Sequence, residues 1–362
     1  MRAAEGVLGA LIVFVALLDM FRAIITPRPV RGRLRLGRYF NPWLWRTCRW
    51  AAFRLPARYR EDLLGSFAPL SVVFLLISWI VLLLLGYGLL LEAFRNEVRP
   101  EPETFTTSLY LAGTSLLTIG FGDYVPTHGA ARAVVLAAGA TGLGTIALVV
   151  TFLFSLFQSF QRREAMVVAT EAAAGAPPSG VTLLETFGMG RVHEDLAGLF
   201  RQWQLWAAEV LDSHLSFPSL AYFRSSHDND SWISSLGAMM DAASLVLTTI
   251  EGGPTAWAKM FRWVGGHCIE DITRYFGLEA DRYVGVELEE YREARRRLAR
   301  AGWTLRDEEE SWAAFQRVRS EYAGRVNAMA RHWAPPPAQW IGDRSVLRFG
   351  RHAARSGPGP IE

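Results

Sequence analysis

Cysteine is nearly absent from this chain, with only Cys48 and Cys268 among its 362 residues. Their spacing fits neither a disulfide framework nor a cysteine-based metal centre, and we expect both thiols to be inert. The sequence also lacks an evident pair of nucleophile and base, and it lacks a glycine-rich phosphate loop placed after a strand. These absences argue against an enzyme and predict no bound cofactor.

Carboxylates are missing from residues 28–60, a stretch that contains ten arginines. They are Arg28, Arg31, Arg33, Arg35, Arg38, Arg46, Arg49, Arg54, Arg58 and Arg60. An excess of positive charge beside apolar segments marks the cytoplasmic side of a membrane protein. The sequence therefore predicts that this stretch is cytoplasmic.

Three apolar runs are close to or above the length of about 20 residues that a bilayer core requires. They are residues 7–25, 63–91 and 131–160. The first run carries Asp19 and Arg22, and Glu5 together with the lack of a small-x-small cleavage site argues against a secretory signal peptide. With the arginine-rich stretch inside, we predict a multi-pass protein of the cell membrane. Its N-terminus and the segment between the second and third runs lie outside, and everything after Arg162 lies inside.

Aromatic side chains are interleaved with these arginines, at Phe40, Trp43, Trp45, Trp50, Phe53 and Tyr59. A basic and aromatic segment can bind nucleic acid, but between two membrane helices we expect the anionic leaflet, at about 1 kcal/mol per surface cation. We predict an interfacial helix on the lipid bilayer and no nucleic-acid partner. Two interpretations stay open, a regulatory site for anionic lipid headgroups and a plain signal of topology.

Between the second and third runs lies a short string whose residue types suit binding of an ion that has lost its water shell. It consists of Thr118, Ile119, Gly120, Phe121, Gly122 and Asp123. Rings of backbone carbonyls can replace the hydration shell of such an ion. Carbonyls directed at one axis need backbone angles that glycine adopts at low cost, which explains Gly120 and Gly122. Residues 105–117 are too short to span a bilayer but fit a helix that enters and returns, with Thr104 or Thr106 as its N-cap.

This string resembles the potassium-channel signature T-V/I-G-Y/F-G-D/N, and Tyr124 and Val125 make it most similar to the pore loops of tandem-pore potassium channels. The resemblance covers roughly residues 66–160. It departs from the family at Leu117, where many relatives have a second threonine, and at Phe121, which lacks a tyrosine hydroxyl. The resemblance implies a pore-loop fold with K⁺ as the permeant ion, bound at Thr118, Ile119, Gly120 and Phe121. Because a filter ring needs four loops and this chain has one, it also implies a homotetramer.

The same resemblance implies roles for residues around the string. Tyr110 and Asp123 fall where relatives place an aromatic and a carboxylate that brace the filter, with Thr114 as a third member. A glycine hinge and the helical face below it imply a cavity lining and constriction at Gly142, Ile146, Val150, Phe154 and Phe157. The alternative is that the phenylalanines of this segment, Phe152 included, face lipid or neighbouring helices. Four outer glutamates either concentrate cations at the mouth or are ordinary solvated charges: Glu92, Glu97, Glu101 and Glu103.

We therefore predict an all-α membrane protein. Its first half contains an N-terminal transmembrane helix (1–26), a basic linker (27–62) and a pore domain of outer helix, pore helix, filter and inner helix (63–163). A second linker (164–180), a helical cytoplasmic domain (181–334) and a flexible tail (335–362) follow. Periodic apolar residues predict helices in the cytoplasmic domain at about 196–211, 230–251, 254–277 (with a possible break at Gly265-Gly266), 279–301 and 307–332. No alternating strand pattern stands out there, which argues against a nucleotide-binding Rossmann-like domain and a cyclic-nucleotide β-roll.

Histidines and acidic or amide residues gather in two short segments of the cytoplasmic domain, at Asp212 and His214 and at His227, Asp228, Asn229 and Asp230. If the chain between them folds back, they can bind zinc or calcium. The alternative is that Asn229 or Asp230 caps a helix and that the histidines are ordinary core or surface residues. Two function classes stay open: a potassium channel whose helical domain assembles or gates the pore, and a membrane signalling or scaffold protein on a pore fold that no longer conducts.

Overall fold

The computed structural model describes residues 2–24, 36–227, 229–281 and 285–341. It is mostly helical, which confirms the predicted fold class, and it divides into two compact units, Met1–Gln158 and Ser159–Glu362. The first unit contains α1 (Arg2–Ile24), α2 (Leu36–Ala52), α3 (Ala57–Ala93), α4 (Phe105–Leu116) and most of α5 (Gly129–Ala174). Four of the ten arginines predicted to mark the cytoplasmic side lie outside the described residues: Arg28, Arg31, Arg33 and Arg35.

Three of the described helices are long and apolar enough to cross a membrane, and they are α1, α3 and α5. They contain the three apolar runs of the sequence, apart from residue 25, which lies outside the described residues. The third helix, α5, however, does not end with its apolar run at residue 160. It continues as far as Ala174 and includes most of the segment predicted as a linker at 164–180. Alanine, methionine and glutamate favour a helix there, and the helix ends at Gly175, whose φ is +79°.

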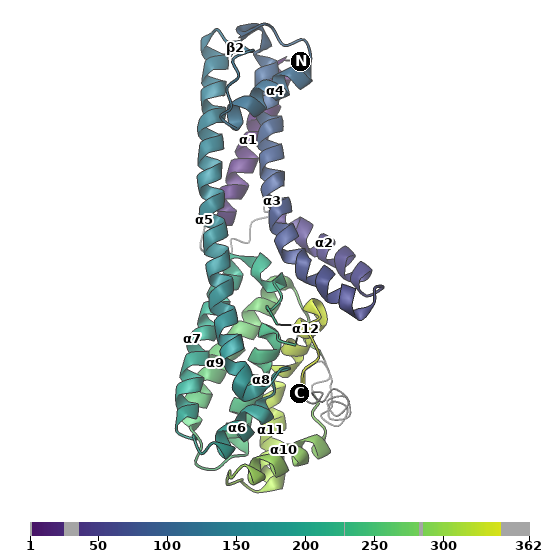
Figure 1. Cartoon of the computed structure of the whole chain (residues 1–362), viewed down its shortest axis with the longest axis vertical. Helices are drawn as coiled ribbons and strands as arrows, with labels where there is room; N and C mark the ends of the chain where they lie inside the picture. The colour runs from purple at the N-terminus through teal and green to yellow at the C-terminus, as the bar shows by residue number, and fades with distance from the viewer. Residues whose placement is uncertain (1, 25–35, 228, 282–284, 342–362) are drawn as a thin grey trace, which may run out of the picture. The chain divides into compact units, whose positions relative to one another are not determined.

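Helices α1 and α3 pack closely along much of their length (Figure 1). Glycines allow this approach, since a Cβ on Gly9 would lie 2.6 Å from the main-chain oxygen of Gly86. Nearer the other end of α1, the Trp79 indole Nε1 donates to Asp19 Oδ2 at 2.7 Å, and both residues are buried. The polar interruption of the first apolar run is thus paired inside the bundle.

A two-stranded antiparallel sheet joins the segments on either side of the filter string. The short 3₁₀ helix η1 (Arg95–Glu97) leads into β1 (Val98–Arg99), which pairs with β2 (Val125–Pro126). The chain before α4 and the chain after the filter are therefore held together.

The second unit is a helical domain arranged around α8. Its elements are α6 (Gly180–Met189), α7 (Asp195–Ser216), η2 (Pro218–Tyr222), α8 (Trp232–Thr248), α9 (Thr255–Phe276), α10 (Leu288–Arg300), α11 (Glu308–Ser320) and α12 (Ala323–Trp333). All but one of the residues of α8 are buried, and α6, α9, α11 and α12 contact it. A buried ion pair joins Arg319 Nε to Asp241 Oδ1 at 2.8 Å in this core.

Several predicted boundaries in this domain are wrong. The helix predicted at 307–332 is two helices, α11 and α12, and the helix predicted at 279–301 begins only at Leu288. Gly265-Gly266 does not break α9. A Cβ on Gly265 would meet Met240 Sδ at 2.8 Å, so this glycine serves close packing against α8. The end of α9 is as predicted, at Gly277 with φ +65°.

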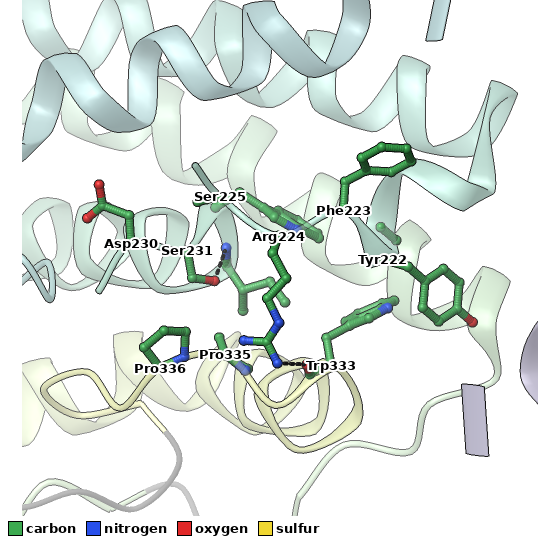
Figure 2. Close-up of a pocket in the computed structure, with 12 residues that line it drawn as sticks. Tyr222, Phe223, Arg224, Ser225, Asp230, Ser231, Trp333, Pro335 and Pro336 are labelled. Carbon is green, nitrogen blue, oxygen red and sulfur yellow. Dashed lines mark hydrogen bonds between the residues drawn. The ribbon is translucent and has the colours of Figure 1, made fainter. Parts of the chain in front are cut away.

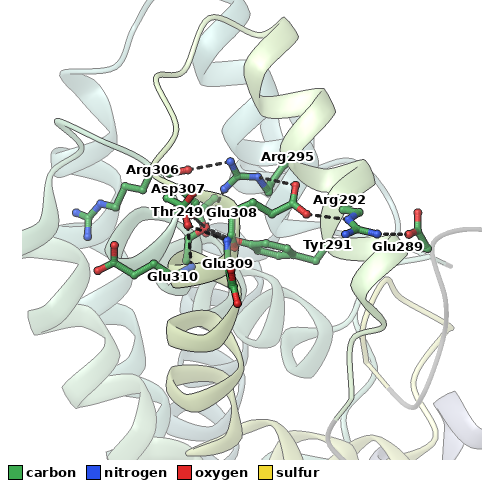
Figure 3. A network of polar contacts seen from close by, with 11 residues as sticks. Thr249, Glu289, Tyr291, Arg292, Arg295, Arg306, Asp307, Glu308, Glu309 and Glu310 are labelled. Atoms are coloured by element: carbon green, nitrogen blue, oxygen red, sulfur yellow. Dashed lines mark hydrogen bonds and ion pairs between the residues drawn. The ribbon is translucent and has the colours of Figure 1, made fainter.

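Polar contacts join α10 to the start of α11 (Figure 3). The Tyr291 hydroxyl donates to Ser311 Oγ at 2.9 Å and also bonds Thr249, while Arg292 Nε donates to Glu308 at 2.8 Å. Asp307 is the N-cap of α11, and its carboxylate accepts hydrogen bonds from main-chain N–H groups of the first turn. These bonds hold the pKa of Asp307 below its ordinary value. This network fixes the edge of the domain.

Candidate functional site: the filter loop and the inner helix

The filter string begins where the chain folds back over the end of α4. The main-chain N–H of Ile119 donates to the carbonyl oxygen of Thr114 at 2.8 Å, and that of Gly120 donates to the same oxygen at 3.3 Å. The Thr114 hydroxyl bonds the Leu111 carbonyl inside the helix at 3.1 Å. Thr114 was expected as a bracing side chain, but its main-chain carbonyl makes the contacts to the string.

Backbone conformation alternates along the string. Thr118, Gly120 and Gly122 have φ of +56°, +63° and +80°, whereas the residues between them are not in the left-handed region. In an ordinary extended strand successive carbonyls point to opposite sides, and placing every second residue in the left-handed region turns them toward the same side. Nothing lies within 4 Å of a Cβ built on either glycine, so φ rather than space requires glycine here.

Thr118 adopts this conformation despite its branched side chain. A β-branched residue with positive φ is a steric outlier and costs on the order of 1–3 kcal/mol. Such strain persists where the surroundings impose it and where function uses it. Thr118 therefore continues, at the end of the string next to α4, the alternation that Gly120 and Gly122 set.

The far end of the string is tied back to α4. The Tyr110 hydroxyl hydrogen-bonds the Asp123 carboxylate, and this bond raises the pKa of Tyr110 above its ordinary value. The rings of Tyr110 and Tyr124 meet edge to face at 6.3 Å. The pair that the resemblance singled out is thus in contact, and the filter is attached to the pore helix at both of its ends.

Two of the outer glutamates have structural partners. Glu92 accepts a hydrogen bond from Ser108 of α4 at 2.7 Å. Glu97 Oε2 accepts from the main-chain N–H of Ala131 at 2.9 Å, in the first turn of α5. Neither of the two earlier interpretations describes them, because they join the outer segment to the helices that flank the filter. Nothing local in the sequence signals these partners.

The inner helix α5 separates its phenylalanines between two environments. Phe152 is buried and its ring meets that of Trp79 at 6.5 Å. Of the residues expected to line the cavity, Gly142 is buried, and the other four are exposed within the single chain: Ile146, Val150, Phe154 and Phe157. The alternative, that a phenylalanine faces lipid or a neighbouring helix, therefore holds for Phe152. Phe154, on the predicted face, stays largely exposed among the described residues.

Gly142 lies against the end of α4. A Cβ at this position would fall 1.7 Å from the carbonyl oxygen of Leu116, two residues before the filter string. The position predicted as a hinge is thus also a place where the inner helix closely approaches the backbone of the pore helix. Only glycine fits there.

Beyond the pore segment, Arg163 anchors the end of α5 in the second unit. Its side chain is fully buried, donates to the carbonyls of Leu220 and Phe223 at 2.9 Å each, and pairs with Glu164 at 2.8 Å. The sequence suggested only a basic flank after a membrane run. The structure makes Arg163 the centre of a buried network.

His214 belongs to this network and not to a metal site. It is fully buried, its Nδ1 lies 2.8 Å from the carbonyl oxygen of Val210, and its Nε2 lies 3.3 Å from Arg163. Burial and the neighbouring Arg163 charge hold the pKa of His214 well below its ordinary value. The predicted grouping of His214 and Asp212 with the later histidine is therefore wrong.

The later segment does find another partner. His227 and Asp230 converge with Glu171 near the end of α5, and one ligand atom from each lies within 4.8 Å of the others. Asp228 lies outside the described residues. Glu171 was missed because it falls in the segment predicted as a linker, far from His227 in sequence.

Both cysteines are sheltered. Cys268 is fully buried and Cys48 is half-buried, and burial raises the pKa of each thiol. This agrees with their expected inertness.

Comparison with known proteins finds a family model that matches part of the chain. Residues 70–159 match the family described as "Ion channel". The chain is also 22% identical over 214 residues to "Uncharacterized membrane protein YdjJ" of Bacillus subtilis (strain 168), covering 58% of this chain and 60% of that protein. The match thus spans less than two thirds of the length of this relative. No solved structure matches the chain significantly.

Proposed function

We propose that the chain is a potassium-selective channel that conducts K⁺ passively, because residues 70–159 match the family described as "Ion channel" and three described helices are long and apolar enough to cross a membrane. The observation that carries the proposal is the alternation of left-handed residues at Thr118, Gly120 and Gly122. A row of carbonyl oxygens replaces the water shell of K⁺ without chemical change to the ion. The bracing by Tyr110 and by the Thr114 carbonyl keeps that row in place.

The conducting form is a homotetramer with cyclic symmetry. One chain supplies one string, and among the described residues its apolar side chains are largely exposed, with Ile119 50% and Phe121 69% exposed. The same holds for the inner-helix face, where Phe154 is 75% exposed. Four copies around one axis would bury the backs of the filter residues and direct the inner faces at the ion path.

The constriction of the closed pore lies on that inner face. Rings of Phe154 or Phe157 are apolar enough to exclude water, and a dewetted segment blocks ions without a plug. The buried Phe152 takes no part.

The N-terminus lies outside, and α2 lies on the cytoplasmic surface of the bilayer. Trp43 and Trp50 of α2 are 64% and 63% exposed, whereas Trp45 packs on Phe67 of α3 with ring centroids 4.9 Å apart. Arg54 stacks on Trp50 at 3.4 Å from its ring centroid. Exposed indoles and arginines suit the headgroup layer of an anionic leaflet.

Ion flux from liposomes that contain the purified protein tests the function. We expect K⁺ to pass far better than Na⁺ and Ba²⁺ to block. Gly120→Ala should abolish flux while leaving assembly intact, because an alanine at φ +63° is strained by only about 1–2 kcal/mol but turns the carbonyls away. Gly198→Ala, on an exposed part of α7 with open space around it, is the matched control. Equal permeability to Na⁺ and K⁺ in the unmutated protein would refute the proposal.

A further inference from the structure

Three side chains with metal-binding atoms meet in the second unit. Glu171 lies in the last turn of α5, and His227 and Asp230 lie in the connection between η2 and α8. Their ligand atoms all lie within 4.8 Å of one another. A local turn sets two of them, since the main-chain N–H of Asp230 donates to the His227 carbonyl at 3.2 Å.

Asp230 gives an independent indication that something is bound here. Asp230 is only 4% exposed, and its Oδ2 has no hydrogen-bond partner among the described residues. A buried carboxylate oxygen is normally paired, because leaving it unpaired loses its hydration without compensation.

The competing explanation for Asp230 was a helix cap, and the structure excludes it. Ser231 is the N-cap of α8, and its Oγ accepts from the Ile233 N–H at 3.2 Å. Figure 2 shows the Asp230 carboxylate directed away from the Arg224 guanidinium, which instead donates to the Ala334 carbonyl at 2.8 Å across the neighbouring pocket. A carboxylate oxygen of Asp230 lies within 4.8 Å of ligand atoms of Glu171 and His227.

We propose that Glu171, His227 and Asp230 bind a divalent first-row transition metal of the Zn²⁺ class. One imidazole nitrogen and two carboxylate oxygens are donors that this class takes, and three protein ligands leave a position for water. Ca²⁺ fits less well because it prefers six to eight oxygens. In a tetrahedral Zn²⁺ site the ligand atoms are about 3.4 Å apart. Small side-chain rotations would bring the three ligand atoms from their present separations, up to 4.8 Å, to that distance. His227 is exposed, which gives the ion a route in.

A bound ion would join the last turn of α5 to the segment that precedes α8. Because α5 is one continuous helix from Gly129 to Ala174, the ion would restrain the helix that carries the pore face. Metal binding would therefore regulate opening. This second step rests on the proposed channel function, whereas the binding site does not.

Zinc titration of the purified full-length protein, by calorimetry after chelator treatment and dialysis, tests the site. We expect about one Zn²⁺ per chain, with affinity at least about tenfold weaker in Asp230→Asn and Glu171→Gln, which keep the shape of each side chain. His227→Gln should weaken binding in the same way, and because His227 is exposed this variant should fold normally. The matched control is His267→Gln on α9, whose imidazole is exposed and bonds the Trp263 carbonyl.

The outcomes separate cleanly. Absence of zinc binding by the unmutated protein would overturn the proposal, and so would unchanged affinity in folded variants of all three ligands. Displacement of zinc by an equal concentration of Ca²⁺ would overturn the assigned metal class.

Potassium flux with Zn²⁺ or with chelator tests the regulatory step. We expect the two conditions to differ in the unmutated protein and in His267→Gln, and to give equal flux in Asp230→Asn. If zinc binds but flux is the same in both conditions, the regulatory step is refuted and the site stands. If no condition gives flux, the channel function fails while calorimetry still decides the site.

Discussion

A single methyl group at Gly142 should displace the pore helix. In Gly142→Ala the new Cβ would lie 1.7 Å from the Leu116 carbonyl oxygen and 2.7 Å from its carbonyl carbon. Ordinary contact begins at 3.4 Å, so the shortfall at the oxygen is 1.7 Å. Both contacts involve main-chain atoms, so no flexible side chain can move aside and one helix must shift.

The expected cost follows from two opposing effects. Alanine normally stabilises a helix interior by about 1 kcal/mol over glycine, whereas forcing extra volume into a packed contact costs about 1–3 kcal/mol. Gly144 is the matched control, because nothing lies within 4 Å of a Cβ built there. Gly144→Ala should therefore gain about 1 kcal/mol. Because both variants receive this gain, they should differ by the packing cost alone, about 1–3 kcal/mol.

Thermal unfolding in detergent and potassium flux in liposomes measure the two consequences. Leu116 lies two residues before the filter string, whose Ile119 and Gly120 bond the Thr114 carbonyl, so a displaced Leu116 should also displace the filter and abolish flux. If Gly142 served only as a hinge, Gly142→Ala would instead give a stable protein in which opening of the pore is altered. If Gly142→Ala is as stable as Gly144→Ala and conducts normally, the close contact does not govern this position.

Three further perturbations test other parts of the molecule. Tyr110→Phe removes the hydrogen bond to Asp123, and patch recording should show faster loss of current during sustained activity; an unchanged time course would mean that Asp123 is held otherwise. Phe154→Ser and Phe157→Ser should raise resting flux at whichever position faces the axis, because serine wets the ring, and no change at either would place the constriction elsewhere. Arg163→Met leaves buried carbonyls and the Glu164 carboxylate unpaired, and denaturant unfolding followed by tryptophan fluorescence should show a loss of about 3–5 kcal/mol. A loss below about 1 kcal/mol there would mean that water replaces the guanidinium.

The helices and the filter string were predictable because their signals are local. Apolar runs of bilayer length mark α1, α3 and α5, and the glycine spacing marks the filter. Composition also predicts an all-helical second unit. Boundaries were less predictable where a stop signal was absent, as in α5, or where a glycine serves packing, as at Gly265.

The candidate metal site shows the opposite case. His227 and Asp230 were candidates from the sequence, but the ligand that completes the group is Glu171 and the expected His214 lies in a separate buried network. Nothing local distinguishes Glu171 from the other acidic residues. Its partners depend on how a long helix passes an irregular segment.

By itself, the sequence determined the apolar helices of membrane-spanning length, the glycine-containing string between two of them and the helical class of the second unit, because each depends on residue type and on spacing within one segment. Tertiary structure decided which residues meet across segments. It paired Asp19 with Trp79, placed Gly142 against Leu116, turned Phe152 inward while Phe154 stayed exposed, and buried Arg163 among carbonyls of η2 and the following residue. These contacts follow from close packing of particular helix faces, and the energy of packing depends on shape and distance that no single segment encodes.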